Sequence, residues 1–191
     1  MAFAIPRPRF FRALGVAALC CCCEPVLRAG PSPATREYDL KAVLILNFTQ
    51  FVDWPAGAFA TGDSPFVIGV LGRDPFGKAL EGVVEGERAG SRPIVVRRFR
   101  SVEDVKGCQM LFINEREKND LPKILAAVKG RPILTVGDYD GFVLRGGMIR
   151  LVKTEDGKVR LRINLDAVKS AGLTVSAKLL RVAEVIAPGE D

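Results

Sequence analysis

Side chains that commonly carry catalysis are scarce in this sequence. None of the 191 residues is a histidine, which removes the commonest general base and metal ligand. Four of the five cysteines form one run, Cys20 to Cys23, and the fifth, Cys108, stands alone. Zinc and iron–sulfur sites need sets of cysteine or histidine that the chain beyond this run does not provide. We therefore expect no metal, no cofactor and no catalytic site, and an enzyme is the least favoured class.

Polar residues that follow predicted strands could instead bind a small ligand. Gly69-Val70-Leu71-Gly72 runs from the end of a predicted strand at 66–71 toward a predicted helix. A single Gly-x-x-Gly is a weak phosphate signal, and a tight turn explains it better. The carboxyl ends of parallel strands are nevertheless where such folds bind ligands. We therefore predict a candidate ligand-binding rim, formed by Arg73, Asp74, Asn114 and Asp138.

A predicted hairpin gathers arginines on one side. Residues 148–153 and 158–164 alternate in polarity around a turn that ends at Gly157. A three-residue loop keeps all apolar side chains on one face, whereas a two-residue loop mixes the faces. The favoured register pairs Leu151 with Leu161 and Ile149 with Ile163. The other face then carries Arg150, Arg160 and Arg162. It is either a solvated face with acidic neighbours or a docking surface for an acidic partner.

A helix predicted at 36–53 is apolar over more than one stripe. Pro55 ends it, because proline disfavours helical backbone in the residue before it. A surface helix usually buries a single apolar stripe. This helix is therefore either buried on two sides or shared with a partner protein. Phe48 and Phe51 are the candidate partner-binding residues of the second interpretation.

The N-terminus has the pattern of an export signal. Arginines precede a short apolar stretch at 13–23, and small residues follow at Ala29, Gly30 and Ala34. The stretch is shorter than the roughly 20 residues that span a bilayer. We predict a cleaved signal peptide at 1–34 and one domain at 35–191 outside the cytoplasm. Leu19 precedes the first cysteine of the run, where a lipoprotein signal has a small residue, so a lipid anchor is disfavoured.

Charge and cysteine content narrow the partners further. The net charge of +6 comes partly from arginines of the N-terminal segment, and the remainder is too weak to indicate nucleic acid. After signal removal Cys108 is the single cysteine, so no internal disulfide can form. Its apolar neighbours favour a buried, unreactive thiol. A disulfide between chains is the other interpretation.

The remaining pattern alternates short strands with helices. Short, continuously apolar strands separated by helices are typical of a parallel sheet that is covered on both faces. We predict an α/β three-layer sandwich with a mostly parallel central sheet of about six strands, a C-terminal antiparallel hairpin and helices on both faces. The predicted strands before the hairpin are 66–71, 93–99, 108–114 and 133–136, and the predicted later helices are 75–84, 101–106, 119–130, 165–170 and 176–186.

Several of these stretches, in this order, resemble the YfiR family of periplasmic regulators. The first is the opening helix that ends in Phe51-Val-Asp-Trp-Pro55. The most specific is 133–138, followed by Gly141-Phe142 and by Gly146-Gly147. Each piece alone is weak, and the ordered combination is specific. The other matching stretches are 90–96, 108–113, 162–164, 171–173 and 179–180.

The resemblance implies a non-enzymatic regulator. Such proteins bind the periplasmic sensory domain of an inner-membrane diguanylate cyclase and lower cyclic-di-GMP and biofilm formation. A sensor kinase is the other partner class that we consider, and the resemblance implies a homodimer. Some members carry redox-sensitive disulfides, but here Cys108 matches a family position and has no second cysteine to pair with. The alternative function is a periplasmic sensor that binds a small ligand and acts on a membrane signalling partner.

Overall fold

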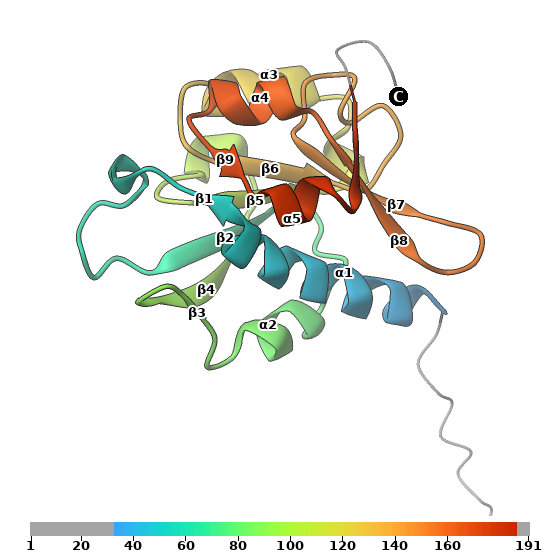
Figure 1. Cartoon of the computed structure of the whole chain (residues 1–191), viewed down its shortest axis with the longest axis horizontal. Coiled ribbons are helices and arrows are strands. Elements are labelled where there is room, and N and C mark those ends of the chain that lie inside the picture. Colours follow the sequence, from blue (N-terminus) through green and yellow to red (C-terminus); the bar gives the residue numbers. More distant parts are fainter. Residues whose placement is uncertain (1–32, 187–191) are drawn as a thin grey trace, which may run out of the picture. The chain divides into compact units, whose positions relative to one another are not determined.

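An eight-stranded sheet forms the centre of the computed structural model, which describes residues 33–186 (Figure 1). The strand order is β10-β8-β7-β6-β5-β2-β4-β3. β2 is parallel to both β4 and β5, and the parallel pairing continues through β6 to β7. The strands are β2 (Phe66–Leu71), β3 (Arg88–Ala89), β4 (Arg92–Phe99), β5 (Met110–Ile113), β6 (Leu134–Gly137), β7 (Ile149–Lys153), β8 (Val159–Ile163) and β10 (Ala183–Val185).

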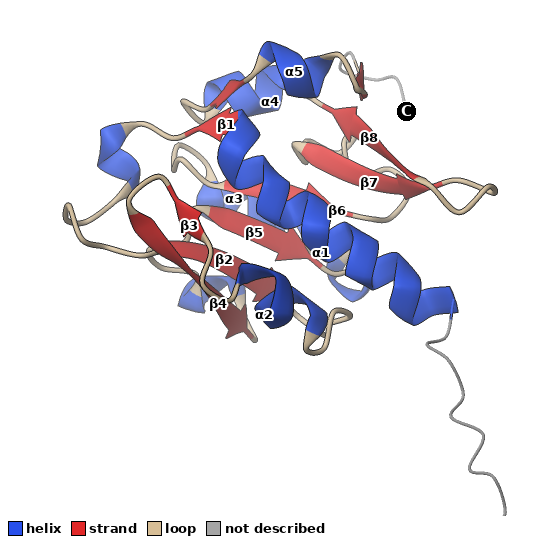
Figure 2. Ribbon diagram, turned by 60° about the horizontal axis from the view of Figure 1, so that its bottom comes forward, coloured by secondary structure: helices blue, strands red, loops and turns tan. Residues whose placement is uncertain are grey.

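Helices cover both faces of this sheet. α1 crosses one face, with α2 beside it (Figure 2). Side chains of α1, α2, α4 and α5 share a core with every second residue of the strands, whereas α3 packs on the opposite face. The three-layer α/β prediction is therefore confirmed. The helices are α1 (Pro33–Phe51), α2 (Ala79–Val84), α3 (Leu121–Val128), α4 (Leu165–Ser170) and α5 (Ala177–Leu180), with 3-10 turns η1 (Ala56–Ala58), η2 (Val102–Asp104) and η3 (Glu115–Glu117).

The arginine hairpin adopts the predicted register. Ile149 pairs with Ile163 and Arg150 pairs with Arg162. The amide of Thr154 donates to the carbonyl of Lys158 at 2.9 Å, which leaves a three-residue loop. Gly157 in that loop has a φ of +78°, a conformation that glycine adopts without steric cost. The apolar face of the hairpin lies in the core, as the side-chain pattern required.

The predicted ends of the first and the last helix are wrong. The first helix ends at Phe51, because Val52 and Asp53 form strand β1 and pair with β9 (Thr174–Val175). The helix predicted at 176–186 stops at Leu180, and β10 then pairs in parallel with β8. Valine and isoleucine dominate 182–186, and β-branched side chains fit a pleated strand better than a helix. β3 and β10 therefore extend the sheet beyond the predicted strands.

A packing constraint explains the glycines at 137 and 147. The ring of Phe142 is fully buried and lies against both positions. A Cβ atom at Gly137 would stand 2.6 Å from this ring, and one at Gly147 would also overlap it. Only glycine lets the backbone approach so closely. These are the residues that make the 133–149 stretch distinctive in the sequence.

The chain reverses direction across the sheet between β2 and β5. From β2 it passes through α2 to β4 on one side, and from β4 it returns to β5 on the other side. α2 lies on one face of the sheet and α3, which follows β5, lies on the other. The loops after two adjacent parallel strands therefore diverge. In open α/β sheets such a switch point opens a crevice at the carboxyl ends of the strands.

Candidate functional site

A cavity of about 890 Å³ occupies this switch point. The loop after β2 forms one wall, the loop after β5 forms another, and the first turns of α1 close a third side. Three of the four predicted rim residues line it, namely Arg73, Asp74 and Asn114. These three residues thus lie together at the carboxyl ends of the strands, and α1 completes the walls of the cavity.

Asp74 and Asn114 hold the two loops in shape. The Asp74 carboxylate accepts a hydrogen bond from the Phe76 amide at 2.7 Å and another from Arg98 Nε at 2.7 Å. Arg98 also pairs with Glu81, and these carboxylates raise the pKa of its guanidinium. Asn114 Oδ1 accepts from the Arg116 amide at 3.0 Å and so begins η3. Both polar side chains therefore form hydrogen bonds within the walls of the cavity.

The basic side chains around the cavity differ in whether they form ion pairs. Lys118 lies 3.6 Å from Glu115 in an exposed ion pair. Arg73, Lys78 and Arg116 also line the cavity, and all three are exposed. Among residues 33–186 none of these three side chains has an ion-pair partner. The cavity therefore has an excess of positive charge within reach of a bound molecule.

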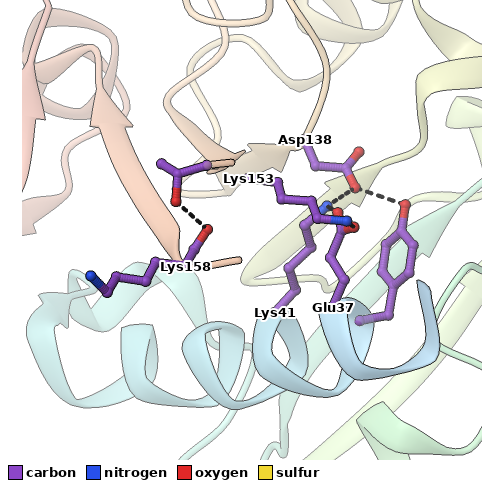
Figure 3. Close-up of polar contacts among 7 residues, drawn as sticks. Glu37, Lys41, Asp138, Lys153 and Lys158 are labelled. Carbon is purple, nitrogen blue, oxygen red and sulfur yellow. Dashed lines mark hydrogen bonds and ion pairs between the residues drawn. The ribbon is translucent and has the colours of Figure 1, made fainter. Parts of the chain in front are cut away.

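Asp138, the fourth predicted rim residue, lies outside the lining of this cavity and binds two side chains of α1. Its carboxylate accepts from the Tyr38 hydroxyl at 2.9 Å and from Lys41 Nζ at 2.7 Å (Figure 3). The side chains of Lys41 and Asp138 are 3% and 5% exposed. Asp138 thus ties α1 to the end of β6 and does not line the 890 Å³ cavity itself, so its role as a rim residue stays a prediction.

Glu37 extends this link to the hairpin. It lies 2.6 Å from Lys41 and 2.8 Å from Lys153 of β7. Burial alone would raise the pKa of Glu37, but the bonds to Lys153 and Lys41 outweigh it and lower the pKa below its ordinary 4.5. Burial and the charge of Asp138 raise the pKa of Tyr38. The network therefore favours an ionised Glu37 and a neutral Tyr38 phenol at neutral pH.

The sequence contained a signal for this network. Positions 38, 41, 45 and 48 recur at the spacing of one helix face, and the last two are the core residues Ile45 and Phe48. Lys41 is the charged residue on that buried face, with 2% of the whole residue exposed. A lysine at a core position requires a buried carboxylate partner. That partner, Asp138, lies 97 residues away, which spacing alone does not reveal.

The hairpin arginines do not form an open basic face. Arg150 is only 8% exposed and pairs with Asp140, and Arg162 Nε lies 3.0 Å from Glu184 of β10. Of the three, only Arg160 is exposed. The register brings Arg150 and Arg162 together, but nearby carboxylates neutralise them. This outcome corrects the docking interpretation for two of its three residues.

α1 is buried on its inner side and carries two exposed apolar residues among polar ones on its outer side. Phe48 is 1% exposed and belongs to the core, so it is removed from the candidate partner surface. Phe51 is half-buried. Leu40 and Val43, which sequence reasoning did not select, are 40% and 41% exposed on the outer side. Burial within the domain is therefore confirmed for the inner side, and contact of the outer side with a partner stays a prediction.

Cys108 is a buried thiol. Cys108 is 4% exposed, and burial raises the pKa of its thiol from 9.0 to about 12. A thiol with so high a pKa contains almost no thiolate at neutral pH. Within residues 33–186 no group of three acidic or cysteine side chains could hold a metal ion, and no helix is long and apolar enough to span a membrane.

A similarity to one solved structure supports the fold. A conserved domain protein from Vibrio cholerae O1 biovar El Tor str. N16961 superposes with a TM-score of 0.50 at 14% identity, over 78% of this chain and 59% of the other. The ABC domain in complex with L-Trp from Streptococcus pneumonia gives a TM-score of 0.48 at 11% identity, over 81% of this chain and 60% of the other. This chain thus spans about three fifths of the length of each.

Sequence comparison identifies the family. No curated protein matches the chain significantly. A family model described as YfiR/HmsC-like matches residues 38–184, from the first turns of α1 to β10. The matched region includes both loops of the cavity, the hairpin and the buried lysine network except Glu37. This protein therefore belongs to the YfiR/HmsC-like family.

Proposed function

We propose that this protein binds the periplasmic sensory domain of an inner-membrane diguanylate cyclase and represses it. The observation that carries the proposal is the family match over residues 38–184. A regulator needs a contact surface and no catalytic cluster, and Leu40 and Val43 offer exposed apolar area on a rigid helix. Repression lowers cyclic-di-GMP in the cell and with it biofilm formation. A sensor kinase with a similar periplasmic domain is the other partner of this class.

The contact surface that we propose centres on the outer side of α1. Exposed apolar side chains contribute favourable binding free energy when an interface removes them from water. Leu40 and Val43 are such side chains, one helical turn apart. Phe51 and Arg160 remain from the sequence prediction as half-buried and exposed candidates. We also propose a homodimer, and sedimentation of the purified protein tests it through the measured mass.

The compartment follows from the same family. We propose export to the periplasm with removal of residues 1–34, which lie almost entirely outside the described residues. N-terminal sequencing of protein taken from the periplasm would locate the cleavage. An N-terminus before Ala29 would place the cleavage outside the proposed region.

Deletion of the gene tests the proposal in the cell. Loss of a repressor should raise cyclic-di-GMP severalfold, and a plasmid copy should restore the lower level. The strain must first be shown to produce the protein under the growth conditions used. Unchanged cyclic-di-GMP in such a strain would contradict repression of a cyclase.

A ligand-binding sensor is the second candidate function. The cavity at the switch point favours it, because small-molecule sites in α/β sheets occur at this place. Thermal denaturation in the presence of a panel of periplasmic metabolites tests it. A raised melting temperature with one chemical class supports a sensor, and no change with any compound counts against it.

A further inference from the structure

We propose that the cavity at the switch point binds a small polyanion, a molecule with two or more phosphate or carboxylate groups, through Arg73, Lys78 and Arg116. The proposal deepens the second candidate function and rests on it for the biological role of the ligand. Binding itself is a property of this protein alone, so it does not depend on the cyclase partner.

The charges around the cavity carry this inference. Both acidic side chains of the cavity form ion pairs. Asp74 lies 2.6 Å from Arg98, and Glu115 lies 3.6 Å from Lys118. The three basic residues of the proposed site have no such partner within residues 33–186. Like charges that share one concave surface repel each other and concentrate anions there. A bound anion would remove that repulsion.

The positions of the three side chains explain why one anion could reach them all. Arg73 and Lys78 stand at the two ends of the loop between β2 and α2. Arg116 lies in η3, in the loop that leaves β5 toward the opposite face. The two loops diverge at the switch point and leave the cavity between them. Arginine binds phosphate and carboxylate oxygens through paired hydrogen bonds, which suits a polyanion.

The size and walls of the cavity favour a small molecule over a protein or a membrane. About 890 Å³ lies within the range of roughly 300–1,000 Å³ that is usual for small-ligand pockets. Tyr38 and Phe76 form an apolar wall, with their rings edge to face and their centroids 5.4 Å apart. The carboxylate of Asp138 already holds the Tyr38 hydroxyl, so this wall is fixed before any ligand arrives. A preformed wall lowers the cost of ordering on binding.

Titration calorimetry of the purified protein with pyrophosphate and with citrate tests the proposal. The test variant carries Arg73→Gln, Lys78→Gln and Arg116→Gln. The control variant carries Arg160→Gln, Arg181→Gln and Lys169→Gln, which removes the same charge and the same residue types from exposed positions outside the cavity. Glycerol serves as the uncharged ligand, and circular dichroism confirms that both variants fold.

We expect the wild type to bind at least one of the two polyanions and not glycerol. The test variant should bind it at least about tenfold more weakly, since charge-assisted hydrogen bonds contribute most of the affinity for such a ligand. The control variant should bind within about threefold of the wild type. Absence of polyanion binding by the wild type, or equal losses in the two variants, would overturn the proposal. A metabolite panel that shifts the melting temperature only with neutral compounds would retain the sensor and reject the polyanion.

Discussion

The basic side chains of the hairpin and those of the switch-point cavity look alike in the sequence and differ in the structure. Arg150 and Arg162 lie beside Asp140 and Glu184, which neutralise them. Arg73, Lys78 and Arg116 lie on diverging loops with no carboxylate partner among residues 33–186. The difference separates a compensated basic cluster from an uncompensated one, and we propose anion binding only for the second.

Lys41 is the extreme case of a compensated charge. It is buried between Glu37 and Asp138, so its partners stabilise a charge that the core would otherwise exclude. Removal of one member of such a network leaves the others buried without a partner. The basic residues thus form a series from fully compensated to uncompensated. Substitutions along this series should show effects on stability that fall in the same order.

The largest effect should follow from Lys41→Met. The substitution leaves the carboxylate of Asp138, whose side chain is 5% exposed, without its cation. We expect a loss of about 3 kcal/mol in the free energy of unfolding, measured by urea denaturation. The matched control Lys78→Met at an exposed cavity position should change it by less than about 0.5 kcal/mol. Equal losses would show that the buried network is not what stabilises α1 on the sheet.

A smaller effect should follow from Arg150→Gln in the hairpin. The Arg150 side chain is 10% exposed, but its partner Asp140 is 94% exposed, so water screens the pair from one side. We expect a loss of about 1 kcal/mol, again by urea denaturation. Arg160→Gln, on the same face of the hairpin, should have almost no effect on the free energy of unfolding, because Arg160 is exposed. If both substitutions destabilise equally, the contrast within the hairpin is wrong.

Acid should weaken the Glu37 link. The pKa of Glu37 is lowered in the folded protein, so its contribution is present above the ordinary value of 4.5 and is lost as the pH falls through the folded value. Glu37→Gln should therefore be less stable than the wild type at pH 7, by about 1 kcal/mol or less. The gap should close below pH 4.5. Thermal unfolding of both proteins across this pH range measures it, and a gap that widens in acid would contradict the assignment.

The smallest effect is expected at Cys108. The thiol is buried, and no other cysteine lies within residues 33–186. We expect the protein without its N-terminal segment to melt at the same temperature with and without reductant. A clear decrease on reduction would show that Cys108 is bridged between two chains, which its burial argues against.

The sequence predicted best where the pattern is local. The continuous apolar run of β2 indicates a strand that is buried on both faces. The alternation in the hairpin allows one register, because only that register places all apolar side chains on one face. Prediction failed where pairing is distant or short. β10 has only three residues and gains its partner β8 by folding, and Lys41 meets Asp138 across 97 positions. The sequence placed Arg73 and Asn114 near each other because the ends of parallel strands share one edge. The compensation of the hairpin arginines depends instead on Asp140 and Glu184, which the spacing does not reveal.

The central claim, repression of a membrane cyclase, can be measured directly. Membranes from the deletion strain, solubilised in mild detergent, would be assayed for conversion of GTP to cyclic-di-GMP with and without the purified protein. We expect saturable inhibition, weakened at least about tenfold by Val43→Asp on the outer side of α1. Val182→Asp, which changes an equally large valine that is 70% exposed near β10, should inhibit like the wild type. Cyclase activity that is unchanged at every protein concentration would contradict the account.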